Sequence, residues 1–157
     1  MKEESLFYES QKFNQWWVWL IIFAVILLNL IIFIKIPSNS MFVLLLLIIG
    51  LAYLFRRIKL ETAIKEDGIY VRFFPLHIMF AFHPWETIEK VYVRTYSAIS
   101  EYGGWGIREG FIAGKAYNVD GEDGLQIEFK NKEKLLIGTA KPDELRKVLV
   151  RLNKIEE

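Results

Sequence analysis

Two long apolar runs stand close together in the first third of the chain. Residues 16–34 hold no charged side chain and one polar one, Asn29, and residues 41–55 hold no charge at all. About twenty helical residues cross a bilayer core, because each adds about 1.5 Å and the core is about 30 Å thick. The first run has this length, and the second reaches it if its helix covers residues 37–55 or continues into Arg56. The pattern predicts a transmembrane helical hairpin over residues 16–34 and 37–55.

Two other structures produce runs of this kind. A secretory signal peptide has a basic start and an apolar stretch of about 7–15 residues, whereas residues 1–12 mix acids with lysines and the first run is longer. Ser38 to Ser40 resembles a cleavage site, but the second run would still anchor the cleaved chain. The runs could also be core helices of a soluble protein, yet about a hundred other residues are too few to enclose two helices apolar on all faces. The hairpin is the favoured interpretation.

Charges at the ends of the runs predict the orientation of the hairpin. Arg56, Arg57 and Lys59 follow the second run, while the connecting loop holds one lysine, Lys35. Cytoplasmic loops carry the excess of Lys and Arg, so both termini are expected in the cytoplasm. Aromatic residues at the start of the first run and the end of the second fit one interface of such a hairpin. Asn29 is expected either to bond across the hairpin or to lie near the far headgroups.

Beyond Arg57 the pattern changes to short, often alternating segments separated by turns. Such segments are typical of strands, and they cover residues 58–65, 69–74, 76–82, 88–96, 105–108, 115–118, 125–129 and 134–139. Residues 66–68 (Glu-Asp-Gly) form a hairpin-turn signal between the first two.

The end of the chain is predicted as an amphipathic helix over residues 142–155. Proline and two acids form its first turn, and apolar residues recur at helical spacing from Leu145 to Leu152. The expected organisation is an N-terminal segment and hairpin over residues 1–57, followed by a mainly-β domain over residues 58–157. About seven antiparallel strands covered by one helix suggest a roll or barrel.

Charge and cysteine content exclude several classes of function for the β domain. From Arg56 onward the chain has 17 Lys or Arg and 16 Asp or Glu. A domain with such balanced charge has no broad basic surface, so nucleic-acid binding is not expected. The chain has no cysteine, which excludes disulfides, thiolate metal sites and cysteine nucleophiles.

Several motifs in this order resemble one protein family. The two apolar runs precede a hairpin over residues 65–74, then Gly-Ile-Arg at 106–108, Tyr-Asn-Val-Asp-Gly at 117–121 and Leu-Ile-Gly-Thr at 136–139 before Pro-Asp-Glu-Leu at 142–145. The chain resembles, over nearly its whole length, the bacterial pleckstrin-homology-like (PH-like) membrane proteins. The resemblance implies two packed sheets and a C-terminal helix, and it implies no catalytic residue.

Motifs for catalysis or metal binding are weak. Residues 110–116 resemble a phosphate-binding loop, but one residue is missing between the glycines and Ala116 lacks the hydroxyl that holds magnesium. His77, His83 and Glu86 could bind zinc only if a tight turn brought the histidines together, because strand residues six apart lie about 20 Å apart. No Ser-His-Asp arrangement is indicated. We therefore expect no cofactor and no metal.

The segment from Tyr96 to Arg108 has an unusual composition. It combines aromatic, hydroxyl and charged side chains with three glycines that permit close backbone approach. Such a mixture suits a binding surface, and the candidate binding residues are Tyr96, Ser100, Glu101, Tyr102, Trp105, Arg108 and Tyr117. It suits equally well a sharp corner or bulge, with Trp105 capping the barrel and Arg108 paired to Glu101 or Glu109.

The expected function is that of a non-enzymatic, membrane-anchored PH-like module at the cytoplasmic face of a bacterial inner membrane. It would bind a membrane protein partner or scaffold a complex, or bind anionic lipid through headgroup contacts of Arg56, Arg57 and Lys59. The alternative is a small membrane enzyme or transporter-associated subunit with its site in the 96–108 loop. A pocket that gathers Tyr102, Arg108 and Tyr117 would favour that alternative.

Overall fold

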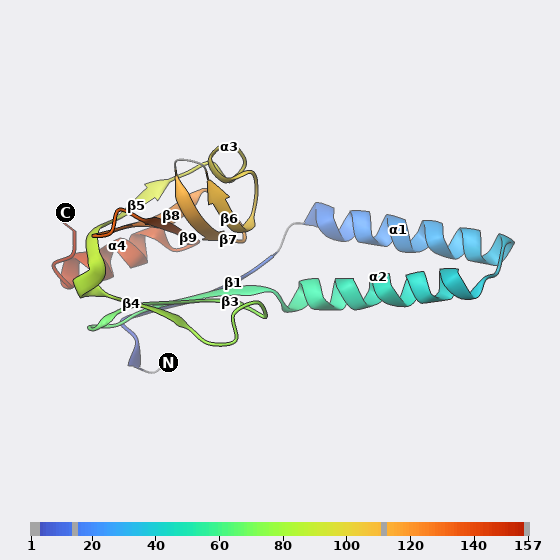
Figure 1. Ribbon diagram of the computed structural model, residues 1–157, viewed down its shortest axis with the longest axis horizontal. Helices are drawn as coiled ribbons and strands as arrows, with labels where there is room; N and C mark the ends of the chain where they lie inside the picture. The colour runs from blue at the N-terminus through green and yellow to red at the C-terminus, as the bar shows by residue number, and fades with distance from the viewer. Residues whose placement is uncertain (1–3, 14–15, 111–112, 156–157) are drawn as a thin grey trace. The chain divides into compact units, whose positions relative to one another are not determined.

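The computed structural model describes residues 4–13, 16–110 and 113–155 and divides the chain into two compact units (Figure 1). Residues 13–58 form a helical unit, whereas residues 1–12 and 59–157 together form a β domain. Residues 4–12 therefore belong with the β domain, and not with the hairpin with which the sequence analysis grouped them.

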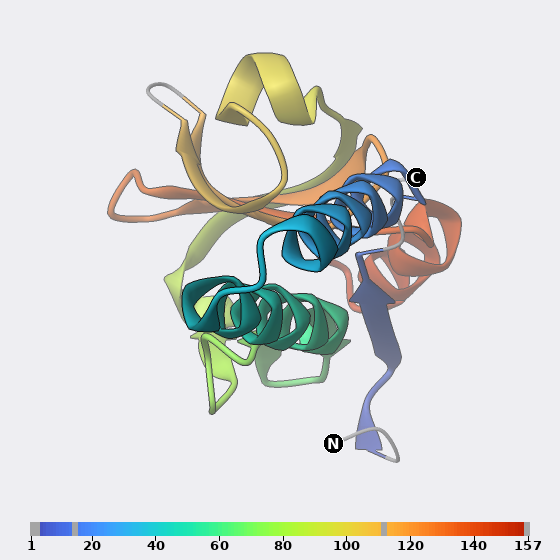
Figure 2. The same cartoon turned by 90° about the vertical axis from the view of Figure 1, so that its right-hand side faces the viewer.

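The helical unit consists of α1 (Trp16–Lys35) and α2 (Asn39–Arg57), which pack side by side (Figure 2). Both helices are long and apolar enough to cross a bilayer, as expected for the predicted hairpin. The Phe55 ring lies 5.1 Å from that of Phe13 and 6.1 Å from that of Trp19. The start of α1 therefore lies beside the end of α2. Asn29 is buried, and its Oδ1 has no hydrogen-bond partner in the described part of the chain.

The first sheet of the β domain contains four antiparallel strands. In spatial order they are β1 (Phe7–Lys12), β2 (Lys59–Ile64), β3 (Gly68–Phe74) and β4 (Ala81–Pro84). β1 and β2 are neighbours although the whole helical unit lies between them in sequence. Gly68 is required at the turn, because a Cβ there would lie 2.4 Å from the His83 carbonyl oxygen.

The strand predicted over residues 76–82 is shorter and later than expected. Residues 76–80 form a loop, and β4 begins at Ala81. Pro75 donates no hydrogen bond to a ladder, and the His77 amide donates to the Phe73 carbonyl in a turn. A 3-10 turn, η2 (Trp85–Thr87), then leads to the second sheet.

The second sheet contains five strands, and a short helix α3 (Ala98–Tyr102) precedes its edge strand β6. In spatial order the strands are β5 (Ile88–Thr95), β8 (Asp123–Phe129), β9 (Lys134–Gly138), β7 (Gly114–Asn118) and β6 (Gly106–Gly110). β7 and β9 run parallel, so the sheet is mixed and not wholly antiparallel.

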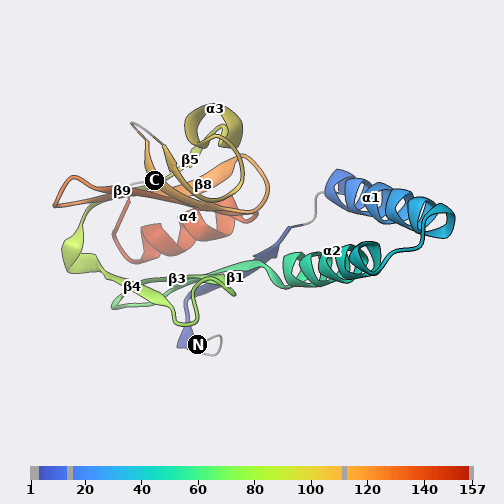
Figure 3. The ribbon, with the colours of Figure 1, turned by 45° about the vertical axis from the view of Figure 1, so that its right-hand side comes forward.

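The two sheets do not close into the predicted barrel. Each is an open sheet whose edge strands, β1 and β4 in one and β5 and β6 in the other, pair on one side only within the described ranges. The helix α4 (Pro142–Arg151) contacts strands of both sheets, namely β1, β5 and β8 (Figure 3). Its buried residues Leu145 and Leu149 belong to the predicted apolar stripe. α4 ends earlier than predicted, shortly before Asn153 adopts a left-handed backbone at φ 54°.

β1 also joins the two sheets through buried polar side chains. The Glu9 carboxyl group accepts hydrogen bonds from the Thr139 hydroxyl at 2.6 Å and from the Ala140 amide at 2.9 Å. The Gln11 side-chain amide donates to the Gly138 carbonyl at 2.7 Å. These bonds connect the first strand of the chain to the end of β9, more than 120 residues later.

Candidate functional site

Polar side chains alternate along two paired strands of the second sheet. Tyr92 and Arg94 lie on β5, and Gln126 and Glu128 lie on β8, with Tyr92 directly opposite Gln126. Every second side chain of a strand points to the same face, so all four share one face of the sheet. On β8, Leu125 and Ile127 alternate with these polar residues and are apolar and fully buried on the other face.

The helix α3 brings a carboxylate to this face. The Ser97 hydroxyl caps the start of the helix by accepting from the Ser100 amide, and Gly103 ends it at φ 70°, a conformation that favours glycine. Glu101 accepts a further hydrogen bond at 2.8 Å from the Ser97 amide. The short helix is thus held at both ends, with the Glu101 side chain directed at Arg94.

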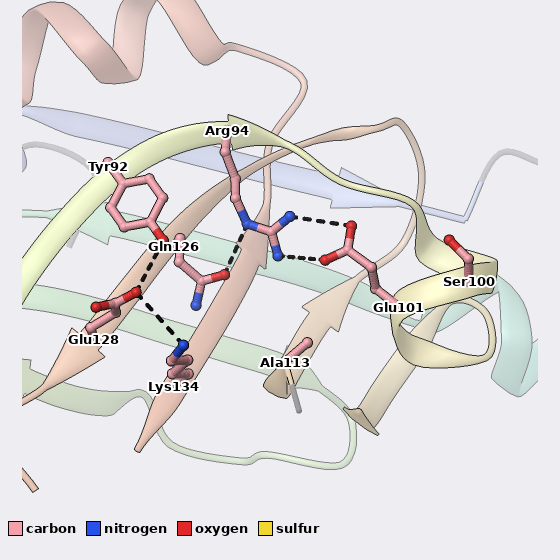
Figure 4. A pocket seen from close by; sticks show the side chains of 8 residues that line it. All are labelled: Tyr92, Arg94, Ser100, Glu101, Ala113, Gln126, Glu128 and Lys134. Atoms are coloured by element: carbon pink, nitrogen blue, oxygen red, sulfur yellow. Dashed lines mark hydrogen bonds and ion pairs between the residues drawn. The ribbon is translucent and has the colours of Figure 1, made fainter. Parts of the chain in front are cut away.

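Between α3 and the strands lies a groove of about 590 Å³ (Figure 4). It is lined by Tyr92, Arg94, Ser100, Glu101, Ala113, Gln126, Glu128 and Lys134.

The Arg94 guanidinium group is the centre of the groove's hydrogen bonds. It donates to both carboxylate oxygens of Glu101, at 2.7 and 3.2 Å, and its Nε donates to the Gln126 Oε1 at 3.0 Å (Figure 4). It also donates to the Tyr102 hydroxyl at 3.2 Å. Hydrogen bonds from Arg94 hold the pKa of the Glu101 carboxyl group below its ordinary value. Glu101 is therefore ionised at neutral pH.

Glu128 forms the second charged cluster of the groove. It accepts a hydrogen bond at 3.0 Å from the Tyr92 hydroxyl, and the Lys134 ammonium group lies 3.9 Å away. Burial, with the hydrogen bond to Glu128, raises the pKa of Tyr92 above its ordinary value. Tyr92 thus remains a neutral donor at neutral pH.

The groove carries two cationic and two anionic side chains, each beside a group of opposite charge. Its formal charge is therefore balanced, unlike that of a site for a polyanion. No histidine or cysteine is among its described lining residues. Paired charges and amide groups of this kind can exchange hydrogen bonds with a polar ligand of mixed charge.

The structure divides the predicted site residues among different environments. Ser100 and Glu101 line the groove. Tyr96 and Tyr102 are buried in a core cluster with Ala98, Ala116 and Leu136, against which Trp105 packs. Burial raises the pKa of both tyrosines.

Arg108 and Tyr117 lie apart from this groove. Arg108 is exposed on β6 and donates from its Nε to the Trp105 carbonyl at 2.9 Å, whereas the ion-pair partner of Glu101 is Arg94. The Tyr117 ring lies 5.4 Å from the ring of His77, which belongs to the loop between β3 and β4. Tyr117 lines a different cavity, which it shares with His83. Among the cavities of the described residues, none gathers Tyr102, Arg108 and Tyr117.

The predicted lipid-contact residues lie at the end of α2 and the start of β2. Arg56 and Arg57 are exposed in the last turn of the helix, and the Arg57 guanidinium group donates to the Tyr53 hydroxyl. Lys59 opens β2, where its ammonium group lies 2.9 Å from the Glu61 carboxylate.

The weak metal motif consists of His77, His83 and Glu86, and the weak phosphate motif is the loop over residues 110–116. No cluster of three or more potential metal ligands occurs among the residues that the structure describes. The His83 ring lies 5.2 Å from that of Phe129, and burial lowers its pKa. In the loop over residues 110–116, Phe111 and Ile112 lie outside the described residues.

Six groove residues were not identified from the sequence, namely Ala113 and the polar residues Tyr92, Arg94, Gln126, Glu128 and Lys134. A signal was present, because polar residues alternate in both predicted strands. It becomes informative only when β5 and β8 are known to pair.

Comparisons with models of protein families, with curated proteins and with solved structures found no match for this chain.

Proposed function

We propose that this chain is a non-enzymatic, membrane-anchored binding module of a bacterial inner membrane. The helical unit would cross the bilayer, and the β domain would bind a segment of a membrane-associated protein at the cytoplasmic face. The proposal combines the two apolar helices with the balanced polar groove on the second sheet.

A PH-like fold for the β domain is part of the proposal. A four-stranded antiparallel sheet is followed by a second sheet and then by a C-terminal helix that contacts both. This order agrees with the resemblance carried by the sequence motifs. The order of elements and motifs does not by itself specify a ligand.

The cytoplasmic location rests on two features. Arg56 and Arg57 end α2, whereas the loop between the helices carries only Lys35. β1 precedes α1 and pairs with β2, which follows α2, so both ends of the hairpin must emerge on one side of the bilayer.

The observation that carries the binding role is the mutual pairing of the groove's charged groups. Arg94 is held by Glu101 and Gln126, and the Lys134 ammonium group lies beside Glu128, so both cations of the groove already have an anionic neighbour. The ionised Glu101 and the neutral Tyr92 are in their ordinary charge states at neutral pH, unlike a tuned catalytic acid or base. A fixed pattern of donors and acceptors with balanced charge suits specific recognition of a polar protein segment.

Blocking the groove tests this proposal. Ser100 is an exposed groove residue, so Ser100→Trp should fill the groove without changing the core. Ile99→Trp is the matched control, because Ile99 is exposed on the same short helix but does not line the groove. We expect tagged full-length protein, purified from native membranes in mild detergent, to lose a reproducible co-purifying protein with Ser100→Trp and to retain it with Ile99→Trp.

Equal recovery of that protein with both variants would show that the groove is not the binding site. Loss of a small-molecule conversion in place of a protein partner would favour an enzyme.

A further inference from the structure

The loop between β3 and β4 exposes an unusual amount of apolar surface. Leu76, Ile78 and Met79 are 68%, 78% and 82% exposed. Four of the six exposed large apolar residues of the β domain lie within residues 76–82, counted over the part of the chain that the structure describes. Contiguous exposed apolar side chains on a folded domain mark an interaction surface.

This loop lies at one particular end of the first sheet, which the strand pairing identifies. β3 ends at Phe74, which pairs with Lys59, and Lys59 pairs with Lys12. Lys12 is the last residue of β1 before the chain enters α1, and Lys59 follows the end of α2 by two residues. The loop therefore leaves the same end of the sheet at which the chain passes to and from both apolar helices.

Contacts with Arg72 on β3 hold the loop in place, while its apolar side chains remain exposed. Arg72 donates to the Ile78 carbonyl at 3.3 Å, and its guanidinium carbon lies 4.4 Å from the centre of the Phe80 ring. The stacked rings of Tyr70 and Phe82, 4.6 Å apart, hold the strand that follows. Leu76, Ile78 and Met79 are thus presented by a braced loop.

We propose that residues 76–79 insert into the interfacial layer of the bilayer that holds α1 and α2. This inference rests on the membrane hairpin of the proposed function, and it adds a lipid contact made by the β domain itself. The occupant is lipid because the loop lies on the sheet end that is joined to both membrane helices. Aliphatic side chains that reach the acyl boundary leave water, as they do for interfacial amphipathic segments. Since the contact is apolar, it should not depend on anionic headgroups.

Single cysteines carrying an environment-sensitive fluorophore test the insertion, since the natural chain has no cysteine. The full-length protein would be labelled at Met79→Cys or Ile78→Cys and reconstituted into neutral phosphatidylcholine vesicles containing a nitroxide-labelled lipid. Ile99→Cys is the exposed control, at 67% exposure on α3, and Leu27→Cys in α1 reports hairpin insertion. We expect nitroxide to quench the probes at positions 78, 79 and 27, and aqueous iodide to quench positions 78 and 79 severalfold less than position 99.

Each other outcome has a defined meaning. Iodide quenching at 78 and 79 equal to that at 99, with position 27 still quenched by nitroxide, overturns the loop insertion alone. Protection from iodide without nitroxide quenching means that protein, such as a second copy, covers the loop, and this also overturns the proposal. Failure of nitroxide to quench position 27 overturns the membrane hairpin and with it the loop insertion.

Discussion

Glu61 is a buried carboxylate on the first sheet that is surrounded by donors. Arg72 Nε and the Tyr8 hydroxyl each donate to it at 2.8 Å, and the Lys59 ammonium group donates at 2.9 Å. Burial alone would raise the pKa of Glu61, but the hydrogen bonds from Lys59, Arg72 and Tyr8 bring the pKa below its ordinary value. The folded state therefore favours the ionised form.

The lowered pKa of Glu61 predicts a pH-dependent contribution to stability. This contribution is complete above the ordinary glutamate pKa of about 4.3 and is lost as the pH falls through the lower pKa of the folded state. Glu61→Gln should reduce the free energy of unfolding by about 3 kcal/mol at pH 7 and by clearly less near pH 3. Urea denaturation of the full-length protein in detergent micelles, followed by circular dichroism, measures both.

The exposed Glu89, paired with Lys132 at the surface, provides a control for this measurement. Glu89→Gln should change the free energy of unfolding by less than about 1 kcal/mol at either pH. If Glu61→Gln lowered the free energy of unfolding equally at pH 7 and pH 3, the stability would not depend on ionised Glu61, contrary to the prediction.

Two buried threonines allow a matched test of the Glu9 contact. The Thr139 hydroxyl donates to Glu9, whereas the equally buried Thr62 Oγ1 has no hydrogen-bond partner among the described residues. Thr139→Val should cost about 1–3 kcal/mol of unfolding free energy, because a buried carboxyl oxygen loses its donor. Thr62→Val should be neutral within about 0.5 kcal/mol or slightly stabilising. The same denaturation assay compares them, and equal losses would show that the Glu9 contact contributes nothing specific.

At the scale of elements, the pairing of β1 with β2 makes a prediction about the two flanks of the hairpin. Lys12 and Lys59 are directly opposite each other, and opposite strand residues have Cα atoms about 4.5–5.5 Å apart, within disulfide range. The Lys12→Cys/Lys59→Cys double variant should form a disulfide on mild oxidation in native membranes. Loss of labelling by a maleimide reagent reports it, because the natural chain has no cysteine.

Lys12→Cys/Lys65→Cys is the control for this cross-link. Lys65 lies six residues from Lys59, directly after the far end of β2, a separation of about 20 Å. This pair should stay fully labelled after oxidation. Equal labelling of both pairs would mean that β1 does not pair with β2 in the membrane-bound protein.

Elements that depend on local pattern were predictable from the sequence, whereas long-range pairings were not. The apolar helices and the stripe of α4 follow from composition and periodicity over a few turns. β1 escaped prediction because its partners are residues 59–64 and Thr139, far along the chain. The groove escaped prediction for the same reason, since the alternation of Tyr92 and Arg94 has no meaning until β8 is placed beside β5.

At the scale of the whole molecule, the proposed topology places both chain ends in the cytoplasm. Alkaline phosphatase, which is active only outside the cytoplasm, should be inactive when fused after residue 157. The same enzyme should be active when fused after Ser38, in the loop between the helices, to a chain truncated there. High activity of the C-terminal fusion would reverse the orientation derived from Arg56 and Arg57.

The long-range bonds of β1 have a consequence for the order of events during synthesis. β1 leaves the ribosome before Thr139 and Gly138, to which it is bonded and which follow it by more than 120 residues. At about 5–20 residues per second, β1 must wait on the order of ten seconds for these partners. In that interval residues 13–58 are synthesised, and they must form the helical hairpin before Lys12 can pair with Lys59. Completion of the first sheet and of its bonds to β9 is therefore a late step, open only to chains whose two apolar helices have already folded back on each other.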